Sequence, residues 1–541
     1  MKTQRVKFFT QNFTAWTSLF LAVFFFICFI LPFFKSISPL FLKAESSFNT
    51  RNLFGTIAFT FKTSLLSTTL ALLLGIISAL LAARGNLFFK NFLLCFSCVP
   101  LCVPALIMAI GYISIFGVNG TASRFIRVLT GSTKPVTFLY SFWGIVTVQG
   151  FYNFPLVMSG VCDALKNLNR THEEAASLLG ASKCRIFFSV TLFKIIPAVI
   201  SSLIPVFLYC FFSFIIVLMF SPPGSTTLEV SVYTLTRARL DFRGAALLCL
   251  IETLCAGIIL FLYSLAEKKA LKAKDIFFLK TETQKTIPSR IEKFFASVFF
   301  VIIVIFFLLP LFSIIFDSFF IPGKNSLSLK FWKELFLMKG FFKSLFSMFA
   351  AGVFTAVFST AAAFFYSAFI SRIKKEKTIL KIIPLLPMTV SSVVLGTGFH
   401  LVFKNPRNFI LVAAQCAMFW PFAFRLIYPA VKKIPLSVTE SALLLSNSET
   451  GVFFTITIPY CKRQILSSLA LCFAMSAGDT TLPLILGIKD FTPLALFTYR
   501  LSSSYRFSHA GCAGIILAAI CVSAFFISMK FKDPHIKGKI Q

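Results

Sequence analysis

Long apolar runs separated by short polar stretches fill this chain of 541 residues. A helix needs about 20 apolar residues to cross the hydrocarbon core of a bilayer. By this criterion the sequence predicts about twelve membrane-spanning helices in an all-α membrane protein. Their approximate ranges are 15–34, 57–82, 92–116, 137–160, 197–220, 244–265, 295–316, 344–370, 382–403, 409–430, 465–487 and 510–529.

The composition supports a membrane protein and excludes two other classes. Hydrophobic residues make up 57% of the chain, charged residues 13%, and the mean hydropathy is +0.87. The net charge of +33 is spread over the loops rather than gathered in a basic domain, so we expect no nucleic-acid partner. The cysteines lie mostly within apolar runs, where a thiol behaves as a small hydrophobe, and we expect no metal site.

One polar stretch, residues 171–193, lies between two apolar runs and is too polar to cross a membrane. Thr171 and Glu174 have the spacing of a capping box, which starts a helix by satisfying its free N–H groups. Gly180 can end that helix in the left-handed conformation that other residues resist. The pattern predicts a short helix suited to docking into a groove of another protein.

The same pattern returns at residues 437–459, aligned without a gap at an offset of 266 residues. Ser437 and Glu440 form a second capping-box pattern, and Ala442 stands where the first copy has Ala176. A second copy in a matching place favours a shared function over two ordinary interfacial helices.

The similarity between the two halves extends beyond these stretches. Matched pairs at offset 266 or 287 are Pro155 and Pro421, Leu228 and Leu494, Tyr233 and Tyr499, and Gly111 and Gly398. The change of offset falls on one loop, which is long at 117–136 and short at 404–408. Loops tolerate such deletions and spans do not. The sequence therefore predicts a duplicated six-helix unit, and an even number of spans makes the two repeats parallel.

The spans and the repeat divide the chain into six segments. These are a leader, first span and loop at 1–56, a first transmembrane domain at 57–265, a linker at 266–294, a seventh span and loop at 295–343, a second transmembrane domain at 344–530, and a tail at 531–541. The first span is long for a signal peptide and lacks a small-residue cleavage site, so we expect it to stay as an anchor. Lys and Arg are in excess on the side of the linker, which places both polar stretches and both termini in the cytoplasm.

The two polar stretches resemble the EAA loops of binding-protein-dependent ABC importer permeases. The resemblance implies two type I importer repeats and a coupling helix in each loop, which docks on a cytoplasmic ATPase. The residues that carry it are Glu174, Ala175, Ala176 and Gly180 in the first copy, and Glu440, Ser441, Ala442 and Ser446 in the second. Ser441 and Ser446 depart from the Ala and Gly of the family pattern, so we expect a looser fit of the second loop.

Two further segments resemble thiamine and thiamine-pyrophosphate permeases, namely 225–248 and 476–507. The fused layout is shared with iron(III) permeases, so iron stays open as an alternative substrate. Asp479 and Thr480 are candidates for the substrate pathway, because an acid within a span suits a cationic solute. The alternative is that Asp479 bonds Thr480 or the backbone and shapes a broken helix. Asp479 and Glu252 are the only acids in the predicted spans.

The chain lacks a G-x4-G-K-[ST] phosphate loop, since the segment at 322–326 has neither the first glycine nor a hydroxyl residue after Lys324. We therefore expect no enzymatic activity and no cofactor on this chain. The family resemblance implies that ATP is used by a separate ATPase, present in two copies. The loops are too short for a solute-binding domain, so we also expect a separate binding protein, either periplasmic or lipid-anchored. We expect this chain itself to lie in the inner membrane. A twelve-helix secondary transporter is the alternative class; its usual loop between spans two and three carries an acid, which 84–91 lacks.

Overall fold

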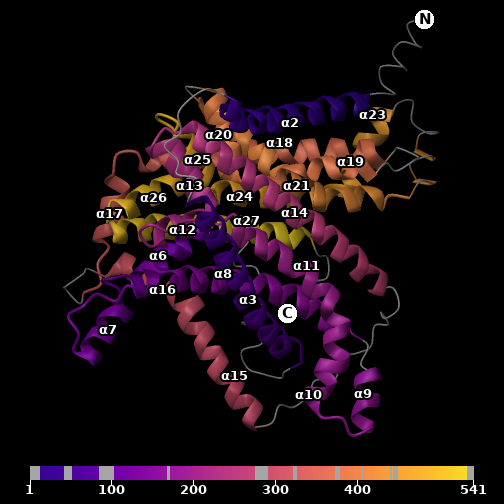
Figure 1. The fold of residues 1–541 in the computed structure, drawn as a ribbon. Coiled ribbons are helices and arrows are strands. Elements are labelled where there is room, and N and C mark those ends of the chain that lie inside the picture. The colour runs from indigo at the N-terminus through magenta and orange to yellow at the C-terminus, as the bar shows by residue number, and fades with distance from the viewer. Residues whose placement is uncertain are drawn as a thin grey trace, which may run out of the picture. The chain divides into compact units, whose positions relative to one another are not determined.

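The computed structural model describes residues 13–41, 52–84, 103–166, 168, 171–274, 290–320, 326–371, 378–403, 406–435, 437–438, 441–442 and 449–532. Within these ranges the chain is helical, and its only β-type pairing is an isolated bridge between Phe320 and Leu327 (Figure 1). The all-α fold expected from the apolar runs is confirmed.

The first half contains the N-terminal α2 and the elements that run up to the linker. Their bounds are α2 (Phe13–Ile37), η1 (Ser38–Phe41), α3 (Leu53–Arg84), α6 (Ala105–Phe116), α7 (Thr121–Thr130), η3 (Phe138–Tyr140), α8 (Phe142–Lys166), α9 (Thr171–Leu178), α10 (Lys183–Ile186), η4 (Phe187–Thr191), α11 (Leu192–Phe211), α12 (Ile215–Phe220), α13 (Leu228–Tyr233), η5 (Thr234–Ala238) and α14 (Phe242–Lys274).

The second half contains the elements that follow the linker. Its bounds are α15 (Arg290–Ile303), η6 (Val304–Leu308), α16 (Leu309–Phe319), α17 (Lys330–Leu337), α18 (Phe341–Ser371), α19 (Thr378–Ile382), η7 (Ile383–Thr389), α20 (Ser392–Val402), α21 (Asn408–Lys432), α23 (Glu449–Val452), η8 (Phe453–Thr457), α24 (Ile458–Gly478), α25 (Thr481–Leu486), α26 (Leu494–Ser503) and α27 (Phe507–Lys532).

The helix bounds follow the offset that the sequence predicts. Adding 266 to the bounds of α8 and α12 gives the bounds of α21 and α25, and adding it to the first residue of α11 gives the first residue of α24. The α7 helix occupies the longer loop of the first half and has no counterpart in the short loop of the second half. The structure thus confirms that a helical unit occurs twice.

The described residues form ten helices that are long and apolar enough to cross a membrane, or eleven if one bent pair is a single span. That pair is Leu380–Thr389 and Ser392–Val402, bent by 89°, and it corresponds to the predicted span 382–403. The predicted span 465–487 is interrupted, because α24 ends at Gly478 and α25 begins at Thr481. The predicted span 197–220 has the matching break between α11 and α12.

The chain divides into two compact units, and each unit contains the first helices of one half together with most of the other half. We call these the exchanged helices. Unit 1 comprises residues 1–47, 232–250 and 329–541, and unit 2 comprises residues 48–231 and 251–328. In unit 1 the helix α2 packs on α18 and α20 of the second half (Figure 1). In unit 2 the helix α16 packs on α6 of the first half.

A glycine permits each of these exchanged contacts. A Cβ built on Gly111 of α6 would overlap the backbone carbonyl oxygen of Pro310, and one built on Gly398 of α20 would overlap that of Pro32. The overlap involves backbone, which cannot rotate away as a flexible side chain can. The matched glycines of the sequence therefore mark one close helix contact that occurs once in each unit.

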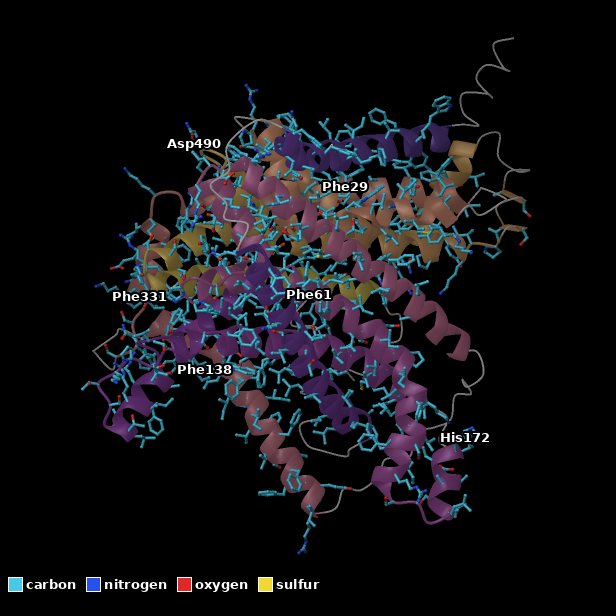
Figure 2. The ribbon with its side chains drawn as sticks, viewed as in Figure 1. Phe29, Phe61, Phe138, His172, Phe331 and Asp490 are labelled. Carbon is cyan, nitrogen blue, oxygen red and sulfur yellow. The ribbon has the colours of Figure 1, made fainter. Side chains whose placement is uncertain are left out.

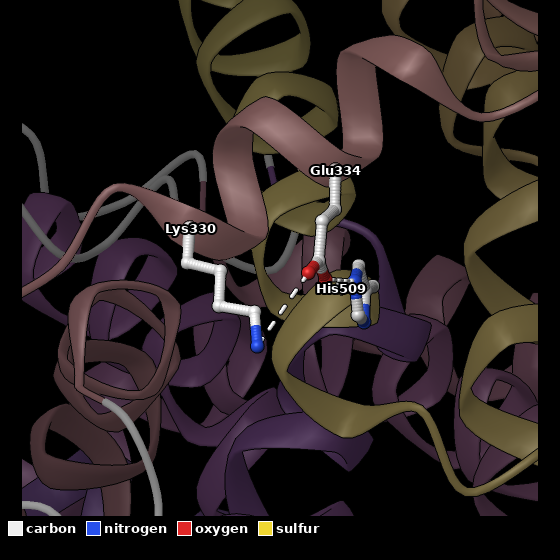
Figure 3. Close-up of polar contacts among 3 residues, drawn as sticks. All are labelled: Lys330, Glu334 and His509. Carbon is white, nitrogen blue, oxygen red and sulfur yellow. Dashed lines mark hydrogen bonds and ion pairs between the residues drawn. The ribbon is translucent and has the colours of Figure 1, made fainter.

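In unit 1 a polar contact between Glu334 and His509 connects α17 to the start of α27. His509 Nε2 lies 2.8 Å from Glu334 Oε2, and Lys330 Nζ lies 3.8 Å from Glu334 Oε1 (Figure 3). Phe331 contacts the His509 ring edge to face, with 5.3 Å between ring centroids. These contacts attach the short helix α17 to α27.

Candidate functional site

The first EAA stretch forms a short exposed helix, as its sequence predicts. Helix α9 begins at Thr171, and Gly180 adopts a φ of 79° just beyond its end. The N–H of Gly180 donates to the Ser177 carbonyl at 3.0 Å, which closes the last turn. Figure 2 labels His172 in the first turn of this helix. The predicted helix and left-handed glycine are confirmed, and the docking role stays a prediction.

Two leucines at the end of this helix are almost fully exposed among the described residues. Leu178 and Leu179 are 89% and 88% exposed, Glu174 and Ala175 are exposed, and Ala176 is half-buried. Leucines this exposed at the end of a polar helix leave apolar surface for another molecule to cover. The arrangement can offer a partner two leucines beside an exposed carboxylate.

Glu173, rather than Glu174, attaches α9 to the rest of unit 2. Its Oε1 atom accepts a hydrogen bond from the Thr191 hydroxyl at the end of η4. The sequence pattern did not single out Glu173, since the capping-box spacing points to its neighbour. Two adjacent acids therefore differ in role: one holds the helix and the other is left at the surface.

The second EAA stretch is described only in part. Glu440 and Ser446 lie outside the described residues, while Ser441 is exposed and Ala442 is half-buried. The chain is described again from α23, which leads into η8. Phe453 at the start of η8 is fully buried and packs against Phe364, with 5.2 Å between ring centroids.

Each EAA stretch ends in a π-helical turn. These turns are η4 at Phe187–Thr191 and η8 at Phe453–Thr457, and they coincide at the offset of 266 residues. Single π turns inside α-helices are rare and occur often at functional sites. The paired phenylalanines at 187–188 and 453–454 were visible in the sequence, but their π-helical backbone was not predicted.

Asp479 lies at the break between α24 and α25. Its Oδ1 atom accepts from the N–H groups of Thr481 and Leu482, at 3.0 and 3.3 Å. Its Oδ2 atom accepts from Gln415 Nε2 at 3.1 Å. A carboxylate in this position satisfies the free N–H groups at a helix start, so these contacts are those of the structural alternative. The Thr480 hydroxyl is buried with no hydrogen-bond partner among the described residues.

The structure shows three further acids that are buried or hydrogen-bonded and that the sequence did not single out. Glu229 is fully buried on α13, in a segment that the sequence places in a loop. Asp317 lies within the span Arg290–Phe319, beyond the predicted end at 316, and accepts a hydrogen bond from Ser114. Asp241 accepts from the Gly244 N–H at 2.8 Å and caps α14. The span Arg290–Phe319 therefore contains an acid that the predicted bounds left out, while Glu229 and Asp241 lie outside the candidate spans.

Tyr233 and Tyr499, which match at offset 266, both lie in unit 1. Burial raises the pKa of the Tyr499 phenol, and the neighbouring Tyr233 raises it further. Among the residues that the structure describes, no group of three or more His, Cys, Asp or Glu side chains could hold a metal ion.

The chain thus has two fused halves of helices long and apolar enough to cross a membrane, with an exposed polar helix after the fourth span of the first half, a layout typical of membrane transport proteins. The sequence profile of the family described as "Binding-protein-dependent transport system inner membrane component" matches residues 71–270 and 367–538. Since the two matches cover more than half of the chain, one in each half, the chain belongs to this family and is a multi-pass inner-membrane permease.

Several relatives match over most of the chain. The thiamine transport system permease protein ThiP of Escherichia coli K12 is 24% identical, over 86% of this chain and 88% of its own length. The ThiP proteins of Haemophilus influenzae Rd and Brucella abortus 2308 are also 24% identical, over 88% and 87% of this chain and 88% and 86% of their own lengths.

Proposed function

We propose that this chain is the permease subunit of an ATP-driven importer of thiamine or thiamine pyrophosphate. The observation that carries the proposal is the repeated EAA stretch within a fused two-half permease whose similarity to the ThiP proteins extends over most of both chains. The family match favours the importer over the secondary transporter. Iron(III) remains the competing substrate, with no iron permease among the relatives reported above.

In the proposed complex a separate ATPase, in two copies, binds the EAA stretches, and a separate binding protein delivers the solute on the opposite side. This chain binds no cofactor and hydrolyses no ATP. The exposed Leu178 and Leu179 beside Glu174 support α9 as the docking helix. ATPase closure would move both stretches and so turn the two halves toward the loaded binding protein.

The proposed substrate is tested by uptake of labelled thiamine and labelled ferric iron. Cells would express this chain with its own ATPase and binding protein, and cells lacking the ATPase would serve as the control. We expect ATP-dependent thiamine uptake. Iron uptake without thiamine uptake would contradict the substrate and leave the importer class standing.

Coupling is tested by reversing charge in the two EAA stretches. Glu174→Lys is expected to lower transport by at least about tenfold, a loss of 1.4 kcal/mol in coupling, while membrane insertion and solute affinity of the binding protein are unchanged. Glu440→Lys is expected to have a smaller effect, because Ser441 and Ser446 indicate a looser fit. Glu174→Gln keeps the side-chain length and is the matched control. Normal transport by both Lys variants would refute the docking role.

Orientation is tested by labelling single cysteines in a cysteine-reduced background. Lys280→Cys in the linker and Ser448→Cys in the second EAA stretch are expected to react only when the cytoplasmic face is exposed. Reaction with an impermeant reagent in intact cells would reverse the proposed topology.

A further inference from the structure

Unit 1 contains a pocket of about 690 Å³ in which basic side chains gather. Its cationic residues are Arg237 of η5, Arg407 at the start of α21, and Lys489 after α25, and His400 of α20 lies beside them. All of these residues belong to the same compact unit, although they come from three separate parts of the chain.

The guanidinium of Arg237 lies against the backbone of Gly487. Gly487 adopts a φ of 59°, and a Cβ at this position would overlap Arg237 Nη2. Glycine is therefore favoured here by its left-handed conformation, and the absence of a side chain leaves room for the arginine. The other side of the guanidinium faces His400, whose Nε2 lies 3.4 Å from Arg237 Nη1.

No acidic residue lines the pocket within the part of the chain that the structure describes. The neighbouring Asp490 is 93% exposed, and it lies 4.0 Å from Lys343, which is outside the pocket lining. Three cationic groups thus share one concavity without a carboxylate in its wall. Such an arrangement lowers the free energy of a bound anion.

The charges are not a requirement of the fold, because the matching elements of the other half lack a basic residue at each of these positions. The positions that match His400, Arg407 and Lys489 are Ile113, Ser141 and Pro223, and Arg237 itself matches Ser503. Helices α12 and α25 nevertheless have the same bounds at the offset of 266. Arg237 belongs to the first half and the other basic residues to the second, and none of them is repeated at the matching position of the other half, which favours a function specific to this pocket.

The pocket and the EAA stretch lie at opposite ends of one helix. Helix α21 begins beside the pocket at Asn408 and ends at Lys432, just before the second EAA stretch. Its 25 residues span about 37 Å at 1.5 Å per residue, which is enough to cross the hydrocarbon core. If the EAA stretch faces the cytoplasm, the pocket opens on the side from which the solute arrives.

We propose that this basic pocket binds a phosphate group. Arginine forks match phosphate oxygens in a bidentate geometry, and the amino end of α21 adds its positive dipole at the same place. The phosphate can belong to a solute, such as a phosphate ester of thiamine, or to a phospholipid headgroup. The solute identity rests on the proposed function, whereas phosphate binding does not.

Phosphate binding is tested with the full chain in nanodiscs of phosphatidylcholine, by equilibrium dialysis against labelled pyrophosphate at fixed ionic strength. Arg237→Gln and Arg407→Gln are each expected to weaken binding by about tenfold, since a hydrogen bond to a charged group is lost. Arg237→Lys is expected to retain part of the binding. Arg506→Gln removes the same charge from unit 1 outside the pocket and is the matched control.

The outcomes separate the pocket from the transported substrate. No pyrophosphate binding, or an equal loss in the Arg506→Gln control, would overturn the proposal. Competition by phosphatidylglycerol nanodiscs, lost in the double variant Arg237→Gln with Arg407→Gln, would identify a lipid headgroup. Slower uptake of thiamine phosphates with normal uptake of thiamine by the double variant would identify the solute. If the wild type imports no thiamine compound, the proposed function fails and dialysis still decides the pocket.

Discussion

The fifth helix of each half breaks at the same place, but different residues hold the two breaks. In the second half Asp479 caps α25 and accepts from Gln415, whereas Ser213 stands at the matching position between α11 and α12. Both helices after the break have the same length and bounds at the offset of 266. The break therefore belongs to the duplicated scaffold and does not depend on the acid.

A matched pair of buried glutamines shows how far the halves have diverged. Gln149 Oε1 accepts from Ser67 at 2.8 Å, and Gln415 Oε1 accepts from Thr355 at 3.2 Å, so the helix-to-helix bond occurs in both units. Gln415 Nε2 also donates to Asp479, while Gln149 Nε2 has no hydrogen-bond partner among the described residues. The halves share their packing, and the second half adds a polar network to it.

Substitutions at the two exchanged helix contacts should cause the largest losses of stability, and the two losses should be similar. Gly111→Ala and Gly398→Ala each force a Cβ against a backbone carbonyl, which we expect to cost about 3 kcal/mol or more of stability. The measurement is the free energy of unfolding in mixed micelles. Gly257→Ala, where a Cβ meets nothing within 4 Å, is the control. Strongly unequal losses at the two sites would show that the two exchanged contacts are not equivalent.

Replacing the residue at the break of the fifth helix should lower stability in the second half only. Asp479→Ala removes the acceptor of two backbone N–H groups and of the Gln415 amide, and we expect a loss of about 2 kcal/mol. Ser213→Ala should change stability by less than about 0.5 kcal/mol. Thermal unfolding of both variants checks the difference.

Asp479→Asn separates structure from pathway at the same position, because an amide oxygen can still cap α25 without the negative charge. Normal stability with slowed uptake of a cationic solute would support a pathway role for Asp479. Normal stability with normal uptake would make its role structural.

The two matched glutamines should show the smallest difference in stability between the halves. Gln415→Leu removes bonds to Thr355, Ser476 and Asp479, whereas Gln149→Leu removes the bond from Ser67 and one unsatisfied donor. Gln415→Leu should therefore be the more destabilising variant by about 1 kcal/mol. Equal losses would mean that the Asp479 network adds nothing to the second half.

The sequence by itself determined the membrane class, the duplication and the position of each EAA stretch. Apolar runs and capping residues act through neighbours along the chain, so Thr171 and Gly180 predict the two ends of α9 without any tertiary information. The gapless offset of 266 likewise predicts the matching bounds of α8 and α21, because equal sequence spacing preserves helix length.

Only the tertiary structure decided which residues from distant segments meet. The exchange of α2 and α16, the contact between Gln415 and Asp479, and the pocket shared by Arg237, Arg407 and Lys489 each join parts of the chain that are far apart in sequence. The sequence pattern shows how apolar a helix is, but it does not identify the element that packs against that helix. The close contacts at Gly111 and Gly398 and the left-handed turn at Gly487 are the backbone features that allow these meetings.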